Sequence, residues 1–178
     1  MKKILSIFLI LTLIFVISAC GGEGGESTTG DGNGEQEIEP IVYSEGLAFT
    51  SNGDGTCFVS GIGNCEDIKL VIPLTSPEGD KVVGIGKDAF AFSDQVRFVI
   101  LHSGIEYIEG GAFSYCGELR YVVIYEGLAR IGDFAFHGNS NLESIYFTGN
   151  EPAWLSISIS AENESLINAK INIGYFPG

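Results

Sequence analysis

Apolar and polar positions repeat every 23 residues between Val82 and Asn150. Three copies follow one another without a gap, at 82–104, 105–127 and 128–150. Six columns hold a hydrophobic residue in every copy: Ile85, Ile108 and Ile131; Ala89, Ala112 and Ala135; Phe90, Phe113 and Phe136; Val96, Leu119 and Leu142; Val99, Val122 and Ile145; Leu101, Ile124 and Phe147. A constant period in the twenties is typical of a solenoid, in which similar units stack side by side.

A single copy has too little apolar surface to fold alone. It offers about six large apolar side chains, each of which contributes roughly 1.5–3 kcal/mol when buried. Ordering the backbone and side chains costs about 1.5 kcal/mol for each residue, which exceeds that gain. Stacking covers both faces of every copy and joins neighbouring backbones by hydrogen bonds, so we expect stability only in the array.

Each copy contains a short strand and a tight turn. Val99 and Leu101 are two positions apart, so their side chains share one face of a strand and point into the core. The equivalent strands of all copies predict a parallel β ladder on one face of the solenoid. Segments such as Asp88–Phe90, with Asp133 able to cap its own copy, predict short helical turns on the other face. The predicted fold class is a leucine-rich-repeat-like α/β solenoid.

The string Ile-Gly-x-x-Ala-Phe occurs at Ile85–Phe90 and again at Ile131–Phe136. It resembles the BspA-type leucine-rich repeat of bacterial surface proteins. Cys116 stands where that family often carries a cysteine, and the middle copy departs from the pattern because Glu109 replaces the glycine. The resemblance extends from Leu47 to the C-terminus. It implies a cell-surface or secreted interaction protein, most commonly one that acts in adhesion, and it implies no catalytic chemistry.

The segment before the regular copies, 41–81, predicts an N-terminal β cap. Two apolar runs on either side of the turn Ser51–Gly55 predict a β-hairpin that shields the first layer. Ile68–Ile72 is ended by Pro73, and it predicts the first strand of the ladder within a degenerate repeat.

The segment after the regular copies, 151–178, predicts a C-terminal β cap. Trp154 and Leu155 are expected to cover the open end of the core, a task that suits a large flat ring. Alternation of apolar and polar residues from Ala169 to Tyr175 predicts a last strand that closes the ladder.

The N-terminus has the pattern of an export signal. Lys2 and Lys3 precede a short apolar run, and small residues stand immediately before Cys20. We expect 1–19 to be a lipoprotein signal peptide and Cys20 to carry the lipid; an ordinary secretory signal with an incidental cysteine is the alternative. The apolar run is shorter than the roughly 20 residues that span a bilayer. Residues 20–40 are rich in glycine and acidic side chains, which predicts a disordered tether.

The charge balance excludes some partners. The chain carries 23 acidic and 9 basic residues, which gives a formal net charge of −14. Nucleic-acid binding needs a basic footprint, so we expect no nucleic-acid partner. The same acidity disfavours electrostatic adhesion to an anionic membrane, so we expect membrane contact through the N-terminal lipid alone.

The strand positions that alternate with the core positions point outward. They predict an exposed strip formed by Phe98, Ile100, His102, Tyr121, Val123, Tyr125 and Tyr146, beside Ser144 and Thr148. Exposed surfaces rich in tyrosine are favoured for recognition. Aromatic and β-branched residues also suit strands for cross-strand packing alone. The sequence leaves both interpretations open.

Reactive side chains form no recognisable catalytic or metal motif in the sequence. His102 and His137 fall in different columns, so we expect them on different sides of the solenoid. The cysteine spacings match no zinc pattern, and no G-x-S-x-G string occurs, so no metal or cofactor is predicted. Cys57 and Cys65 flank a Gly-containing bend, and the sequence leaves open whether they form a disulfide. Cys116 is expected to remain unpaired.

These features predict a lipid-anchored binding or adhesion module, located outside the bacterial membrane, whose partner is an extracellular protein or a glycan. A structural spacer, or a module that self-associates through the exposed strip, is the first alternative. A cell-wall or polysaccharide hydrolase is the second alternative, although the scattered carboxylates single out no acid–base pair.

Overall fold

The computed structural model describes residues 41–175. The predicted signal peptide (1–19), the Cys20 lipidation site and the predicted tether (20–40) lie outside the described residues. The described chain forms these elements: β1 (Ala48–Ser51), β2 (Thr56–Gly61), β3 (Lys69–Val71), β4 (Lys81–Ile85), β5 (Phe98–Leu101), β6 (Tyr107–Ile108), β7 (Tyr121–Ile124), β8 (Arg130–Ile131), β9 (Ser144–Phe147), α1 (Glu151–Leu155), β10 (Ser158–Ile159), α2 (Glu164–Asn168) and β11 (Lys170–Ile173). Neither of these two helices has the length and apolar character needed to cross a bilayer.

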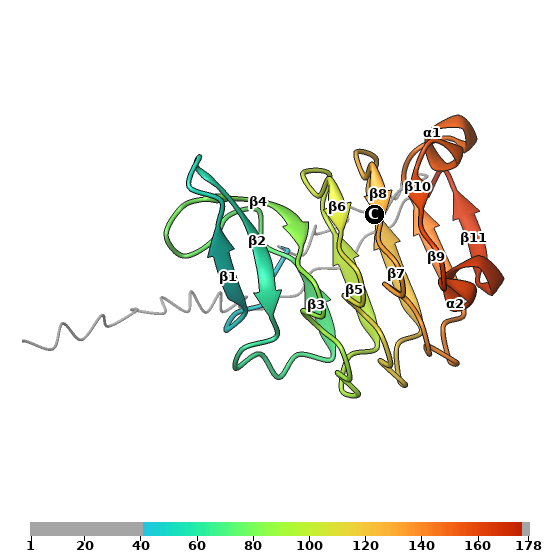
Figure 1. Ribbon diagram of the computed structural model, residues 1–178, viewed down its shortest axis with the longest axis horizontal. Coiled ribbons are helices and arrows are strands. Elements are labelled where there is room, and N and C mark those ends of the chain that lie inside the picture. Colours follow the sequence, from blue (N-terminus) through green and yellow to red (C-terminus); the bar gives the residue numbers. More distant parts are fainter. Residues whose placement is uncertain (1–40, 176–178) are drawn as a thin grey trace, which may run out of the picture. The chain divides into compact units, whose positions relative to one another are not determined.

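Two sheets enclose the core (Figure 1). One sheet has five strands in the order β3-β5-β7-β9-β11, and all of its pairs are parallel. The other has six strands in the order β1-β2-β4-β6-β8-β10, with a single antiparallel pair at its β1 edge. From β3 onward the chain alternates between the two sheets, which confirms the predicted repeat solenoid.

The pairing register of the five-stranded sheet follows the period of the sequence. Phe98 lies opposite Tyr121, and Tyr121 lies opposite Ser144, so each strand pairs with the next one without any slip. The strands β3 and β11 continue this register on either side. Equivalent residues of successive repeats are therefore cross-strand neighbours, which is the parallel ladder that the sequence predicted.

The core contains a column of stacked phenylalanine rings. The rings of Phe90, Phe113 and Phe136 are fully buried, and neighbouring centroids lie 5.1 and 5.2 Å apart. Each ring fills the space between two layers, so every internal copy depends on the copies on both sides. Ring pairs at this spacing contribute roughly 0.5–1.5 kcal/mol beyond the burial of their area.

The second sheet lies on the side for which the sequence predicted short helical turns. Its strands β6 and β8 are two residues long and pair in parallel. The Ala-Phe segments close isolated turns, as where the N–H of Ala89 donates to the carbonyl of Gly86. The backbone is left-handed at Asp88 (φ 53°) and at Phe92 (φ 60°), and a right-handed helix cannot continue through such residues. The predicted helical turns are therefore reduced to single turns.

The glycine of the repeated string allows neighbouring turns to approach closely. A Cβ on Gly132 would lie 2.6 Å from the backbone nitrogen of Gly110, and one on Gly86 would lie 2.7 Å from the ring of Phe58. Neither Gly86 nor Gly132 has a positive φ. Close packing, and not a left-handed backbone, is therefore what glycine provides in this column, which is why Glu109 is accommodated in the middle copy.

The N-terminal cap contains the predicted hairpin. Strands β1 and β2 pair antiparallel around the turn at 51–55, and β2 joins the six-stranded sheet by parallel pairing with β4. The hairpin thereby covers one edge of that sheet. Strand β3 pairs in parallel with β5, as predicted for Ile68–Ile72.

The C-terminal cap closes the ladder through β11, which pairs in parallel with β9 as predicted. The elements α1, β10 and α2 do not follow from the sequence pattern. Trp154 is half-buried, and its ring meets the ring of Phe147 edge-on with centroids 5.4 Å apart. The prediction that Leu155 shares this role is wrong, because Leu155 ends the short helix α1 and is 73% exposed. Asp133 was predicted to cap the turn of its own copy, but its carboxylate instead accepts a hydrogen bond from the N–H of Ala161 in this cap.

A column of small polar side chains joins the turns of neighbouring repeats. The N–H of Cys116 donates to Oδ1 of Asn139 (2.8 Å), and Nδ2 of Asn139 donates to the carbonyl of Phe113 (2.9 Å). The thiol of Cys116 lies 3.0 Å from the carbonyl of Phe90. Turns buried against each other leave backbone groups without ladder partners, and these side chains provide the partners.

Candidate recognition surfaces

A row of aromatic rings crosses the outer face of the five-stranded sheet. The ring of Phe98 on β5 stacks on Tyr121 of β7 with centroids 5.3 Å apart, and Tyr121 lies 6.3 Å from Tyr146 of β9. Tyr146 lies 4.8 Å from Tyr175, which follows β11. We call these four side chains the aromatic row. Phe98 and Tyr121 are direct cross-strand neighbours, whereas Tyr146 lies opposite Val123 and so reaches Tyr121 diagonally across the same face.

The aromatic row is only partly open to solvent. Phe98 is 39% exposed, while Tyr121 and Tyr146 are half-buried by the rings next to them. Ile100 and Val123 on the same face are also half-buried. The structure thus brings these five predicted binding-face residues together on one surface.

The polar end of the row is held by hydrogen bonds. The hydroxyl of Tyr121 donates to Oε2 of Glu143 (2.6 Å), and the other carboxylate oxygen of Glu143 pairs with the Arg120 guanidinium at 2.8 Å. The hydrogen bond to Glu143 raises the pKa of Tyr121 above its usual range. The same bond, together with Arg120, lowers the pKa of Glu143. The rings are thus flanked by a fixed pair of charges.

The two other predicted members of the binding face, His102 and Tyr125, lie apart from these five residues. His102 links two turns, because Nε2 lies 3.1 Å from the carbonyl of Pro73 after β3, while Nδ1 accepts from the N–H of Gly104 in its own turn. Burial lowers the pKa of His102, so the ring is neutral at pH 7 and has both nitrogens engaged. His102 thus has a structural role between neighbouring turns, and its predicted binding role stays a prediction. Tyr125 is half-buried one position beyond the end of β7.

The disulfide that the sequence left open is not formed. Cys57 and Cys65 are both buried free thiols. The hairpin pairs Cys57 with Ser51, and Cys65 lies beyond the end of β2. Burial raises the pKa of both thiols, so both are protonated at neutral pH.

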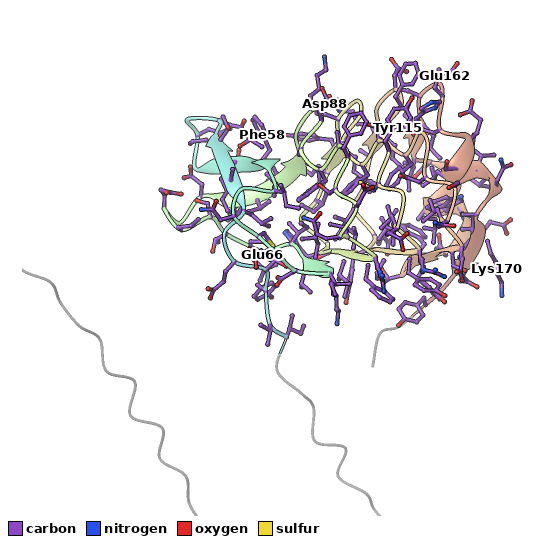
Figure 2. The ribbon with its side chains drawn as sticks, turned by 90° about the horizontal axis from the view of Figure 1, so that it is seen from below. Phe58, Glu66, Asp88, Tyr115, Glu162 and Lys170 are labelled. Atoms are coloured by element: carbon purple, nitrogen blue, oxygen red, sulfur yellow. The ribbon has the colours of Figure 1, made fainter. Side chains whose placement is uncertain are left out.

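A second surface, which the sequence analysis missed, lies along the turns that follow β4, β6 and β8. It is a shallow groove of about 720 Å³, which we call the turn groove. Figure 2 shows Asp88, Tyr115 and Glu162 along this edge of the solenoid, with Glu66 and Lys170 on the opposite edge. The volume lies within the range of roughly 300–1,000 Å³ that is typical of ligand sites.

Exposed aromatic side chains surround the turn groove. Phe92 is 70% exposed, Tyr115 is 48% exposed and Phe134 is 47% exposed. The rings of Phe92 and Tyr115 are stacked with centroids 5.1 Å apart. Tyr115 and Phe134 both meet the ring of His137 edge-on, at 5.3 and 5.4 Å. The rings of Tyr115 and Phe134 thus both contact the His137 ring, and all three residues line the groove.

These aromatic residues occupy a backbone conformation that glycine adopts in other copies. Tyr115 (φ 55°) shares its column with Gly138 (φ 74°), and Phe134 (φ 58°) shares its column with Gly111 (φ 68°). A left-handed residue with a Cβ costs roughly 1–2 kcal/mol, and glycine escapes that cost. The solenoid itself therefore does not require an aromatic side chain at either position.

Charged side chains line the floor and rim of the groove. Asp88, Glu109 and Asp133 contribute carboxylates, whereas Lys87 and Arg130 contribute positive charges. The guanidinium of Arg130 is paired with Glu109 at 2.6 Å, which raises the pKa of Arg130. Lys87 is the one cation of this set outside that pair, so the groove is acidic.

One end of the groove holds a histidine beside two carboxylates. Nδ1 of His137 is buried, has no hydrogen-bond partner within residues 41–175, and lies 3.7 Å from Oε2 of Glu164. Donor atoms of His137, Glu162 and Glu164 all lie within 4.8 Å of one another, so these residues could hold a divalent cation. The sequence analysis predicted no metal donor set, because Glu162 and Glu164 belong to the cap and fall outside the repeat register.

One sequence signal for the turn groove was available. Large aromatic residues at 92, 115 and 134 stand in columns that hold glycine in another copy, a substitution that burial does not explain. His102 and His137, in contrast, lie on different surfaces, as their columns predicted.

Both surfaces belong to a parallel β-solenoid whose repeats present side chains on a sheet face and along a turn edge. Residues 64–173 match the model of the "BspA type Leucine rich repeat region" in six copies. The chain belongs to this BspA-type leucine-rich repeat family. The match extends beyond the three regular copies on both sides, so degenerate copies flank the regular ones.

Three solved structures share the fold. A leucine-rich repeat protein from Bacteroides capillosus ATCC 29799 is 22% identical with a TM-score of 0.57, covering 73% of this chain and 96% of that one. One from Bacteroides ovatus ATCC 8483 is 21% identical with a TM-score of 0.54, covering 75% of this chain and 41% of that one. A leucine rich cell surface protein from Faecalibacterium prausnitzii A2-165 is 19% identical with a TM-score of 0.53, covering 76% and 43%.

The chain spans about two fifths of the length of the Bacteroides ovatus and Faecalibacterium prausnitzii proteins. At these identities the likeness shows the fold alone. No curated protein matches the chain.

Proposed function

We propose that the protein is a binding or adhesion module of the bacterial cell surface, and not an enzyme, and that it is anchored through a lipid on Cys20. Three observations support the proposal: membership of the BspA-type repeat family, a structural neighbour described as a cell surface protein, and small residues before Cys20 in an export-signal pattern. The partner is an extracellular protein or a glycan.

The aromatic row carries the proposal. It is a continuous line of rings across neighbouring strands, and its Tyr121 ends in a hydroxyl fixed to a charged pair. Tyrosine and arginine are enriched among the residues that dominate interface energies. Such a row offers a partner a rigid apolar surface with polar groups along its border.

The test compares two variants of the full-length chain in a binding screen against extracellular-matrix proteins and surface glycans. Tyr121→Ala combined with Tyr146→Ala is expected to reduce binding at least tenfold, about 1.4 kcal/mol. Tyr43→Ala removes an exposed tyrosine outside the row and is expected to bind normally. Equal binding by both variants would contradict the assignment of the row.

The same variants separate recognition from self-association. If a second copy covers the row, the wild-type protein increases in size with concentration in light scattering, and the double variant stays monomeric. A wild-type protein that remains monomeric at all concentrations favours an external partner.

The anchor has its own test. Metabolic labelling with palmitate is expected to mark the wild-type protein in bacterial membranes and to be lost in Cys20→Ser. Labelling that persists in Cys20→Ser would overturn the anchor but would leave the binding proposal intact.

A further inference from the structure

We infer that the turn groove is a second recognition site, distinct from the aromatic row, and that it binds an uncharged saccharide. Sugar rings would stack on Tyr115 and Phe134, and sugar hydroxyls would donate hydrogen bonds to the carboxylates between them. The inference rests on the groove alone and does not depend on the row.

The first support is the occurrence of aromatic residues where the backbone favours glycine. Tyr115 and Phe134 keep bulky side chains at left-handed positions that Gly138 and Gly111 occupy in other copies. About half of each aromatic side chain remains exposed, so burial does not compensate fully for the backbone cost. Backbone strain of this kind gathers at functional sites, where an external role maintains it.

The second support is the arrangement of the rings. The ring of Tyr115 lies over Gly138, where a Cβ would come within 2.6 Å of it, so the glycine makes room for the tyrosine. Phe134, from the next copy, meets the ring of His137 edge-on, as Tyr115 does. The two aromatic side chains thus share His137 as a neighbour and line one groove open to solvent.

The third support is the charge of the groove. The groove holds the carboxylates of Asp88, Glu109 and Asp133 against the cations Lys87 and Arg130, and Arg130 is paired with Glu109 at 2.6 Å. Outside that pair two carboxylates face one lysine, so the groove keeps hydrogen-bond acceptors and disfavours an acidic polymer. A wholly apolar ligand would bury the carboxylates without partners, which is costly. A neutral saccharide meets both requirements, because it has apolar ring faces and many hydroxyl donors.

The experiment is affinity electrophoresis of the full-length chain in gels that contain neutral glucans, mannans or chitin oligosaccharides, with polygalacturonate as the acidic comparison. Isothermal titration then measures affinity for the oligosaccharide that retards migration most. We expect at least one neutral saccharide to bind and polygalacturonate not to bind. Tyr115→Gly combined with Phe134→Gly should reduce the affinity at least tenfold.

Control variants distinguish a lost binding site from a lost fold. The glycine variants use the residue found in the same columns, so they are expected to fold, which circular dichroism and the Tm check. Asp88→Asn is a second variant that suits the left-handed backbone, and it should weaken binding severalfold while the fold is unchanged. Tyr43→Ala removes an exposed tyrosine outside both surfaces and should bind the saccharide as the wild type does.

Three results would overturn the inference. The first is the absence of binding by every neutral saccharide at millimolar concentration. The second is saccharide binding that survives Tyr115→Gly with Phe134→Gly and Asp88→Asn but is lost with the row variants. The third is binding of aromatic peptides to the groove with no effect of any saccharide in competition.

Discussion

Left-handed backbone at the turn edge is maintained by glycine in some copies and by bulky residues in others. The two columns concerned are Asp88, Gly111 and Phe134, and Phe92, Tyr115 and Gly138. At such positions the choice of residue affects stability through the backbone as well as through contacts. Glycine is therefore a matched substitute here, whereas alanine is not.

We expect Phe134→Gly to be more stable than Phe134→Ala by about 1 kcal/mol, because alanine keeps the left-handed cost and glycine does not. Both variants lose the same partly exposed ring. Urea denaturation of the two proteins measures the difference. An alanine variant that is equal or superior in stability would show that the backbone at 134 is not the cost we infer.

In the core, Phe113→Ala should destabilise the protein by about 3–5 kcal/mol, because its ring is fully buried between Phe90 and Phe136. Chemical denaturation measures the loss. Phe92→Ala removes a ring that is mostly exposed, so it should cost less than about 1 kcal/mol. Similar losses in the two variants would contradict the role of the buried column.

The buried thiol of Cys116 is expected to lower the free energy of unfolding at alkaline pH. Burial raises the pKa of its thiol from 9.0 to about 11. Below pH 9 the thiol is protonated in both the folded and unfolded states, whereas between pH 9 and 11 the unfolded state loses the proton more readily. The free energy of unfolding should therefore fall by about 2–3 kcal/mol across this interval.

Denaturation curves from pH 8 to pH 11 test this prediction against Cys116→Ser, which places the residue of Ser93 in the same column. The serine variant should lack this part of the pH dependence, although other groups continue to titrate in both proteins. Identical pH dependence of the two proteins would show that Cys116 is not protected as the structure indicates.

At the scale of the element, the distance between neighbouring turns decides which residues the repeated string tolerates. A Cβ on Gly132 would lie 2.6 Å from backbone atoms of the preceding turn, so the two turns would have to separate. The backbone of the middle copy already accommodates the Cβ of Glu109. This column therefore requires glycine at Gly132 but accepts a larger side chain at Glu109.

Gly132→Ala should therefore destabilise the protein by about 1–3 kcal/mol, as overpacking does in well-packed interiors. Glu109→Ala should cost less than about 1 kcal/mol, because it removes an exposed ion pair with Arg130 and adds no atoms. Thermal unfolding of both variants provides the comparison. A neutral Gly132→Ala would contradict the close approach of the turns.

At the scale of the whole molecule, stability depends on closed ends. Strand β11 pairs with the last regular strand β9, and Trp154 packs against Phe147 at the same end. An uncovered parallel strand presents unpaired backbone groups that pair with other chains. The caps are therefore part of the fold, as in other repeat proteins whose terminal units differ from the internal ones.

Truncation after Asn150 removes α1, β10, α2 and β11 together and leaves β9 as an open edge. We expect the truncated chain to aggregate or to remain largely unfolded, as measured by light scattering and circular dichroism. A monomeric, cooperatively folded product would show that the C-terminal cap is dispensable.

The sequence by itself determined the repeat solenoid and its core. The 23-residue period specified which residues enter the core and how β5, β7 and β9 pair, because in-register parallel stacking repeats each column at every layer. The second sheet, which lies where the sequence predicted helical turns, did not follow from the period. The family and the outward direction of Phe98, Tyr121 and Tyr146 followed from the same pattern. Features that recur at a constant spacing can be recognised from the sequence alone.

Tertiary structure decided what the period does not encode. The exposed rings of Tyr115 and Phe134 belong to different columns, and both contact His137 only because successive turns stack on one another. Glu162 and Glu164 reach the same edge from the cap. His102 contacts the carbonyl of Pro73, which its position in the repeat did not predict. Contacts of this kind depend on the path of the backbone in space, which the local sequence does not specify.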